Sequence, residues 1–261
     1  MKYKLGFIGC GNMGGALAVA AKKSISAQKI ALFDKNEQKL AALAEAVGAN
    51  ALSLSETVQN SRFLVLGVKP QDYPALAKEI SPYLNGQVLI SMAAGVSIAA
   101  VKSEFGHLPV IRIMPNTPAK VGRGMILYAT DGVSEQEEQD FLAAFAAAGV
   151  IDKLAEEKID AASALSGCGP AFCYLFLDAL ANGAVECGLS PDKAQLYAAQ
   201  TMLGAAQMVL TYGEPIKRKD EVCSPGGTTI EGVKALEKAD MHGVAVSAVK
   251  ASYHRTLELK K

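Results

Sequence analysis

Six residues near the start of the chain have the types and spacing of a turn that holds the diphosphate of a dinucleotide. They form a G-x-G-x-x-G pattern: Gly9, Cys10, Gly11, Asn12, Met13 and Gly14. In such a turn the first glycine permits the tight bend, the second lets the backbone approach the diphosphate, and the third allows close helix–strand packing. Free N–H groups at the start of the following helix attract the negative charge. We therefore expect a dinucleotide cofactor to bind here.

An acidic residue, Asp34, lies twenty residues after Gly14, at the end of the next predicted strand. A carboxylate at this place accepts a hydrogen bond from a ribose 2′-hydroxyl and so favours NAD(H). Lys35, Asn36 and Lys39 follow it, and they could neutralise and bind the 2′-phosphate of NADP(H) if Asp34 turns away. Both cofactors stay open on this pattern.

Three further predicted strands end in unusual loops. Ligands of doubly wound sheets bind beyond the carboxyl ends of the strands, so these loops are expected to line the site. The small residues of the second loop leave room for a nicotinamide ring or a substrate. The candidate cofactor-binding residues in the three loops are Val68, Lys69, Pro70, Ala94, Gly95 and Asn116.

The sharpest motif of the second half is S-P-G-G-T-T at residues 224–229. Thr228 and Glu231 have the spacing of a capping box, which predicts Thr228 as the N-cap of a helix and Glu231 reaching back to it. A glycine-containing loop that leads into a helix N-terminus can hold a carboxylate or a phosphate. We expect such an anion to be bound by Ser224, Gly226, Gly227, Thr228 and Thr229.

Other catalytic signatures are missing from the sequence. The three histidines lack motif context, and there is no G-x-S-x-G, H-E-x-x-H or P-loop pattern. The five cysteines are scattered and form neither a disulfide framework nor a metal-ligand pattern, so no metal site is expected. Hydride transfer to a cationic carbon–nitrogen double bond suits such a chain, because the cofactor carries the hard chemistry.

The first half of the chain alternates apolar strands with Ala-rich helices. We predict strands over residues 5–9, 30–34, 63–68, 88–92, 110–114 and 124–129, and helices over 14–23, 37–47 and 74–84. This order predicts an α/β fold, a doubly wound parallel sheet of the Rossmann type. We expect residues 1–155 to form this dinucleotide-binding domain.

From Glu156 onward the sequence is rich in long helices. One begins at Gly169-Pro170 and stops at Cys187-Gly188, and the next runs from Ser190-Pro191 to Tyr212-Gly213. Two more are expected over about 229–239 and 242–260. Residues 156–261 are therefore predicted to form an all-helical domain that dimerises through close helix packing and binds substrate.

Composition limits the partners. The 261 residues carry 26 Lys+Arg and 26 Asp+Glu, a net charge of zero, which argues against nucleic-acid binding. Half of the residues are hydrophobic, so the chain can build a core. No targeting or clean membrane-spanning segment is expected, and we interpret the protein as soluble and cytoplasmic.

Four landmarks occur in order along the whole chain: residues 7–14 (FIGCGNMG), 68–70 (VKP), 114–118 (MPNTP), and 166–170 (SGCGP) with 224–229 (SPGGTT). In these landmarks the chain resembles the pyrroline-5-carboxylate reductases, the last enzymes of proline synthesis. The last pair is specific to that family, whereas the first is shared with many dehydrogenases.

The resemblance implies reduction of L-1-pyrroline-5-carboxylate to L-proline by an NAD(P)H-dependent oxidoreductase that acts on a C=N bond. It implies NADPH as the usual cofactor, with NADH possible because of Asp34. Family members are homodimers, and several assemble further into decamers. The 224–229 loop would hold the substrate carboxylate, Glu156 would lie near the ring nitrogen, and Thr229 is a candidate proton donor. Glu221 lies near a place where some relatives carry Asn near the substrate.

Two other functions fit some features of the sequence. A 2-hydroxy-acid dehydrogenase would share the two-domain plan, but it would need a Lys on the helix after Gly169-Pro170, whose first turns have none. A non-catalytic nucleotide sensor would use the helical half to bind a partner protein, yet it would have no use for an anion-binding 224–229 loop.

Overall fold

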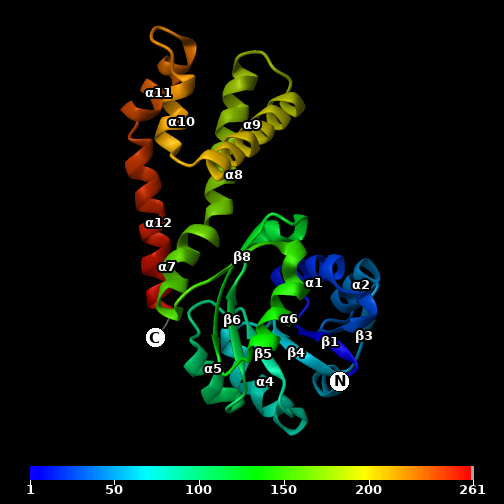
Figure 1. Cartoon of the computed structure of the whole chain (residues 1–261). Coiled ribbons are helices and arrows are strands. Elements are labelled where there is room, and N and C mark those ends of the chain that lie inside the picture. Colours follow the sequence, from blue (N-terminus) through cyan, green and yellow to red (C-terminus); the bar gives the residue numbers. More distant parts are fainter. Residues whose placement is uncertain (260–261) are drawn as a thin grey trace. The chain divides into compact units, whose positions relative to one another are not determined.

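The computed structural model describes residues 1–259, and these form two compact units (Figure 1). The first unit is Met1–Cys168 together with the end of the chain from Ser252, and the second is Gly169–Ala251. The division between the units thus falls after α7 (Glu156–Ser166), whereas the sequence places the domain boundary before this helix, between residues 155 and 156. The boundary between functional domains stays a prediction, and residues 260 and 261 of the predicted second domain lie outside the described residues.

The first unit is built on one sheet whose strand order is β3-β2-β1-β4-β5-β6-β7-β8. The strands are β1 (Tyr3–Ile8), β2 (Ile30–Phe33), β3 (Asn50–Ala51), β4 (Ser61–Leu66), β5 (Val88–Ser91), β6 (Val110–Met114), β7 (Gly124–Asp131) and β8 (Gly149–Lys153). Neighbouring strands are parallel except β6 and β7, which are antiparallel. The predicted fold class, a Rossmann-type α/β sheet followed by a helical region, is confirmed.

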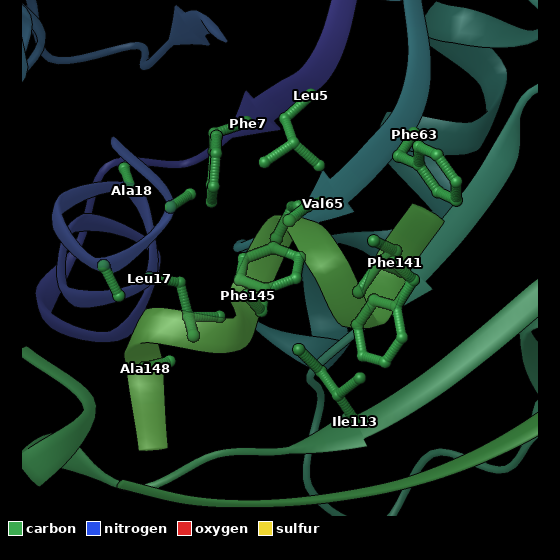
Figure 2. Close-up of a cluster of buried hydrophobic side chains, with 14 of the residues drawn as sticks. Leu5, Phe7, Leu17, Ala18, Phe63, Val65, Ile113, Phe141, Phe145 and Ala148 are labelled. Carbon is green, nitrogen blue, oxygen red and sulfur yellow. The ribbon is translucent and has the colours of Figure 1, made fainter. Parts of the chain in front are cut away.

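Two layers of helices cover the sheet because its strands are apolar on both faces. In β1, Leu5 and Phe7 belong to one buried cluster while Ile8 belongs to the other, as the alternation of side chains along a strand requires. Helices α1 (Asn12–Ser24), α2 (Glu37–Val47) and α6 (Glu135–Phe145) pack on the first face. Figure 2 shows Phe141 and Phe145 of α6 packed in that cluster with side chains of β1, α1 and β4.

The opposite face is covered by α3 (Leu54–Asn60), α4 (Tyr73–Ile80), α5 (Ile98–Phe105) and α7. Full burial of a Leu, Ile or Phe side chain stabilises a fold by about 1.5–3 kcal/mol. Since both faces hold many such side chains, the sheet is a rigid platform for the loops at its edges.

The sheet departs from the predicted all-parallel arrangement at β7. A short 3-10 turn, Thr117–Val121, and Gly122, which has a φ of +75°, lead the chain from β6 directly into β7. A parallel neighbour would need a longer crossover connection, so β7 runs antiparallel. Strands β3 and β8 were not predicted, because β3 has only two residues and β8 ends in charged, exposed residues.

The second unit is helical. It contains α8 (Gly169–Glu186), α9 (Pro191–Tyr212), α10 (Pro215–Val222), α11 (Thr228–Lys238) and the beginning of α12 (Met241–Glu258), whose end belongs to the first unit. Helix α9 has the predicted bounds, whereas α10 was missed because its sequence, PIKRKDEV, is largely charged. The predicted end of the last helix, Lys260, lies outside the described residues.

Apolar side chains of the second unit are widely exposed. In α8 and α9 the buried residues are Ala181 and Ala194, one in each helix, while Leu175 and Leu210 are 74% and 79% exposed. By length and composition alone, the stretch Glu156–Glu186 would also be able to cross a membrane. A large exposed apolar surface of this kind marks an interaction face.

Candidate functional site

The glycine-rich turn lies at the point in the sheet where the strand order reverses. Strands β2 and β3 lie on one side of β1 and β4 lies on the other, and ligands of doubly wound sheets bind at this switch point. Gly9 follows β1 with a φ of +104°, and Gly67 follows β4. A Cβ at Gly14 or Gly67 would lie 2.3 or 2.6 Å from the Gly9 carbonyl oxygen, so a larger residue at either position would force the turn apart.

A cavity of about 530 Å³ opens beside this turn, at the carboxyl ends of β1, β2 and β4. It brings together predicted cofactor residues from three separate loops: Gly9, Gly11, Asp34, Lys35, Val68 and Lys69. A second hollow, of about 790 Å³, lies along the other side of the turn and is lined by Cys10, Gly11, Asn12, Lys39, Thr117 and Lys120, among others. The close glycine packing, the free start of α1 and these lysines fit a dinucleotide with its diphosphate at the turn.

The Asp34 carboxylate is engaged by the backbone on both oxygens. Its Oδ2 accepts a hydrogen bond from the Cys10 N–H at 2.6 Å, and its Oδ1 accepts one from the Asn36 N–H at 2.8 Å. The Asn36 side chain in turn accepts from the Lys39 N–H and caps α2. Asp34 therefore ties the glycine-rich turn to the start of α2. Lys39 and Lys35, whose Nζ lies 3.8 Å from Glu79 Oε2, are cations on the cavity wall.

The Cys10 thiol is neutral at physiological pH. Burial and the neighbouring Asp34 charge raise the pKa of this thiol from 9.0 to about 12. Its Sγ lies 3.6 Å from the carbonyl oxygen of Phe33, to which the thiol donates. Because the thiolate is the nucleophilic form, Cys10 acts as a small packing residue of the turn and supplies no nucleophile.

Some predicted cofactor residues do not line either hollow through their side chains. Met13, Asn36 and Pro70 lie next to lining residues, and Ala94 is exposed after β5. A Cβ at Gly95 would lie 3.6 Å from the backbone of Leu259, so the last described turn of the chain packs against this loop. The cofactor roles of these residues stay predictions.

Asn116 and Glu156 have other partners in the first unit. The Asn116 amide donates to the Ser166 carbonyl and accepts from the Met125 N–H, both at 2.9 Å. The Glu156 Oε1 accepts from the Ile98 N–H at 2.7 Å and pairs with Arg112 Nη1 at 3.2 Å. The predicted contacts of Asn116 with cofactor and of Glu156 with substrate stay untested, and these side chains already hold protein groups together.

The 224–229 loop of the second unit leads into α11, but its predicted capping box is wrong. Helix α11 begins at Thr228 with Gly227 as the N-cap, so Thr228 is one residue too late to cap it. Glu231 instead pairs with Lys234 at 2.7 Å. Gly226, with a φ of +71°, turns the loop, and the Gly227 N–H donates to the Ser224 carbonyl at 3.0 Å.

The uncapped start of α11 is open to a ligand. No side chain caps α11, and Ser224, Thr228 and Thr229 are exposed. The first turn of α11 therefore presents its N–H groups beside these hydroxyls. Such a set can bind an anion.

Relatives of known name match the chain over its whole length. Pyrroline-5-carboxylate reductase of Pisum sativum is 39% identical over 98% of this chain and 96% of its own. The enzyme of the same name from Escherichia coli is 36% identical over 100% of both chains. The chain belongs to the pyrroline-5-carboxylate reductase family.

Domain and structure comparisons agree with this membership. Residues 156–259 match the family model described as pyrroline-5-carboxylate reductase dimerisation, and residues 4–95 match the model described as NADP oxidoreductase, coenzyme F420-dependent. The crystal structure of Plasmodium falciparum pyrroline carboxylate reductase with NADP bound has a TM-score of 0.89 and 30% identity, covering 100% of both chains. The predicted family and the class of NAD(P)H-dependent oxidoreductases are confirmed.

Two charged cavity residues of this family member, Asp72 and Lys120, were not predicted from the sequence. Asp72 lies in the 3-10 turn after Lys69, and Lys120 lies in the turn after β6. Both continue loops that were already predicted to line the site. Among residues 1–259, no group of three or more His, Cys, Asp or Glu is arranged to hold a metal ion.

Proposed function

We propose that the chain reduces L-1-pyrroline-5-carboxylate to L-proline, with NADPH as the preferred cofactor and NADH as the alternative. The observation that carries this proposal is full-length similarity to reductases of that name. The cavity at the switch point of the sheet supports it, because the glycine-rich turn and the lysines there fit a dinucleotide.

Residues of the first unit would hold the cofactor. The N–H groups at the start of α1 bind the diphosphate, and the loops after β4 and β5 line the nicotinamide end. When bound, the reduced nicotinamide supplies the hydride that forms the new C–H bond at the imine carbon. The protein contributes the position of the two reacting carbons, which must lie about 3–3.5 Å apart.

The loop at 224–229 would hold the substrate carboxylate. The N–H groups of the first turn of α11 and the hydroxyls of Ser224 and Thr228 are the proposed donors. The ring nitrogen needs one proton in the overall reaction, which the Thr229 hydroxyl could pass on. The Thr229→Ala variant tests this role, and near-full activity would remove it while leaving the reaction assignment intact.

The preference for NADPH follows from charge. Both Asp34 oxygens already accept backbone N–H groups, so neither depends on a ribose hydroxyl for a partner. Lys35 and Lys39 supply two cations next to them on the cavity wall. A 2′-phosphate would gain charge-assisted hydrogen bonds from these lysines.

A second copy of the chain is the proposed partner of the helical unit. The match of residues 156–259 to a dimerisation domain supports a homodimer. The decamer is proposed only from the resemblance of the sequence to this family. The stretch Glu156–Glu186 lies in that region, so we assign its apolar face to protein–protein contact and propose a soluble, cytoplasmic enzyme. Neither nucleic acid nor membrane is a proposed partner.

The decisive experiment follows the absorbance of the reduced nicotinamide with purified protein, pyrroline-5-carboxylate and either NADPH or NADH. Loss of absorbance together with formation of proline is expected, and NADPH should give the higher kcat/KM. Folded protein that binds nucleotide but consumes neither cofactor would contradict the proposal and favour a nucleotide sensor.

A further inference from the structure

The geometry points to Arg112 and Asn116 as positioning residues that fix helix α7, and with it the Ser166–Cys168 turn, to the loop beside the glycine-rich turn. In this arrangement Glu156 and Asn116 act as struts of the first unit and do not touch substrate or cofactor. The inference rests on the proposed function only for its effect on the reaction.

Arg112 holds the first half of α7. It lies in β6 with 2% of its surface exposed, and its guanidinium reaches two carboxylates of α7 at once. Nη1 lies 3.2 Å from Glu156 Oε1, and Nη2 lies 2.5 Å from Asp160 Oδ1. Residues four apart share one face of a helix, so the two carboxylates fit the planar fork of one arginine.

Glu156 joins a third element to this contact. Its Oε1 also accepts the N–H of Ile98, the first residue of α5, at 2.7 Å. The carboxylate thus satisfies a free N–H group at the start of α5 while it pairs with Arg112. A carboxylate with these two partners serves as a joint between β6, α5 and α7.

Asn116 holds the last residue of α7. Its side chain is 8% exposed, its Nδ2 donates to the Ser166 carbonyl, and its Oδ1 accepts from the Met125 N–H in β7. Asn116 lies two residues after the end of β6. Strand β6 and the loop that follows it therefore contact α7 at three places: at its first residue and in its second turn through Arg112, and at its last residue through Asn116. The Gly167 N–H then donates to the Ser163 carbonyl at 2.7 Å and continues the turn.

The same loop reaches the nucleotide side. Thr117 and Lys120, which follow Asn116, line the hollow that also contains Cys10, Gly11 and Asn12. Residues 112–120 therefore connect the glycine-rich turn with the end of α7 through one short, proline-stiffened segment. A shift of this segment would displace the Ser166–Cys168 turn, which opens the 166–170 landmark shared with the pyrroline-5-carboxylate reductases. If that landmark borders the site, such a displacement is costly in rate.

Four variants test this assignment. Asn116→Asp keeps the acceptor for Met125 but loses the donor to Ser166. Arg112→Met removes both ion pairs, while Arg112→Lys can satisfy one of them. Glu156→Gln keeps an oxygen for Ile98 but loses the charge. Asp140→Asn is the matched control, because Asp140 of α6 forms a half-buried ion pair with Lys4 of β1 at 2.8 Å.

Four quantities are measured: NADPH affinity by fluorescence without substrate, kcat and KM, the pH profile of kcat, and hydrogen exchange at the Gly167 amide. We expect Asn116→Asp and Arg112→Met to lower kcat/KM by about tenfold or more while NADPH affinity is unchanged. Arg112→Lys should be intermediate, Glu156→Gln should keep the wild-type pH profile, and Gly167 should exchange faster in Asn116→Asp.

Three results would overturn the inference. Weaker NADPH binding in Asn116→Asp would make Asn116 a cofactor ligand, and a shifted pH profile in Glu156→Gln would place that carboxylate at the substrate. If Asn116→Asp has the kcat/KM of the wild type and the same hydrogen exchange at Gly167, the positioning role is excluded. This outcome decides the inference even if Arg112→Met does not fold. If the wild-type protein does not reduce the substrate, the proposed function is lost while the exchange at Gly167 still decides the inference.

Discussion

The hydrogen-bond partners of Asp34 change the cofactor preference that is inferred from this residue. Its position after β2 favours NAD(H), yet its two oxygens accept the N–H groups of Cys10 and Asn36. Lys35 and Lys39 lie on the same cavity wall, and in the proposed function they favour NADPH.

Replacing Lys39 with Gln should raise KM for NADPH by about tenfold and leave KM for NADH unchanged. A hydrogen bond to a charged group contributes about 1.5–3 kcal/mol, and about 1.4 kcal/mol corresponds to tenfold in affinity. Initial rates with both cofactors measure this ratio at low salt, since Lys39 is exposed and salt screens it. Lys23→Gln, at the exposed end of α1, is the control, and equal changes for both cofactors would contradict a 2′-phosphate contact.

We expect the Cys10 thiol to make the stability of the folded protein depend on pH. The pKa of its thiol is raised from 9.0 to about 12 in the folded protein, so the unfolded chain releases this proton first as the pH rises. The free energy of unfolding should therefore contain a contribution that is complete below pH 9 and is lost as the pH approaches 12. Thermal unfolding followed by circular dichroism from about pH 8 to about pH 11 should show a steeper loss for the wild type than for Cys10→Ala. Parallel curves would contradict it.

At the scale of elements, the N–H groups at the start of α11 matter more for anion binding than any single hydroxyl. With Gly227 as N-cap and no side-chain cap, the first turn keeps its N–H groups for an anion. Gly226 sets the direction of the loop because its φ of +71° is unfavourable for other residues.

The Gly226→Ala variant should raise KM for pyrroline-5-carboxylate and leave NADPH affinity unchanged. A side chain at positive φ costs about 1 kcal/mol or more, which the loop can relieve only by turning its N–H groups away from the substrate carboxylate. Steady-state kinetics and nucleotide titration separate the two effects. Gly232→Ala, within α11 and with open space around its Cβ, should instead stabilise the helix by about 0.5–1 kcal/mol. An unchanged KM in Gly226→Ala would remove this loop from the substrate site.

At the scale of the whole molecule, the helical unit has too little core of its own. Large apolar side chains of α8 and α9 face outward, Leu210 with 79% of its surface exposed. Burial of such surface is the main favourable contribution to subunit association. The proposed homodimer therefore stabilises the helical unit by burying this surface.

The Leu210→Glu variant should shift the protein from dimer toward monomer and lower its melting temperature. A carboxylate in an apolar interface is desolvated without a partner, which is strongly unfavourable. Light scattering after size exclusion measures the mass, and melting temperatures at several concentrations measure the linkage to assembly. Val150→Glu, at an exposed position of β8 in the first unit, is the control. A stable dimer of Leu210→Glu would place Leu210 outside the interface.

Features that depend on local spacing could be predicted before the chain was folded. The glycine-rich turn, the alternation of strands and helices, the bounds of α2 and α9 and the family landmarks are all short patterns within about twenty residues. Local patterns also explain the error at α11, where the capping-box spacing was present but began one residue late.

Contacts between residues that are far apart in the sequence could be identified only in the folded chain. Arg112 and Asp160 are 48 residues apart, and Asn116 and Ser166 are 50 apart. The antiparallel β7 likewise depends on the length of a turn that no strand pattern encodes. Side-chain partners are fixed by packing of the complete sheet and helices. The tertiary structure alone therefore shows that Asp34, Asn116 and Glu156 connect separate elements through hydrogen bonds.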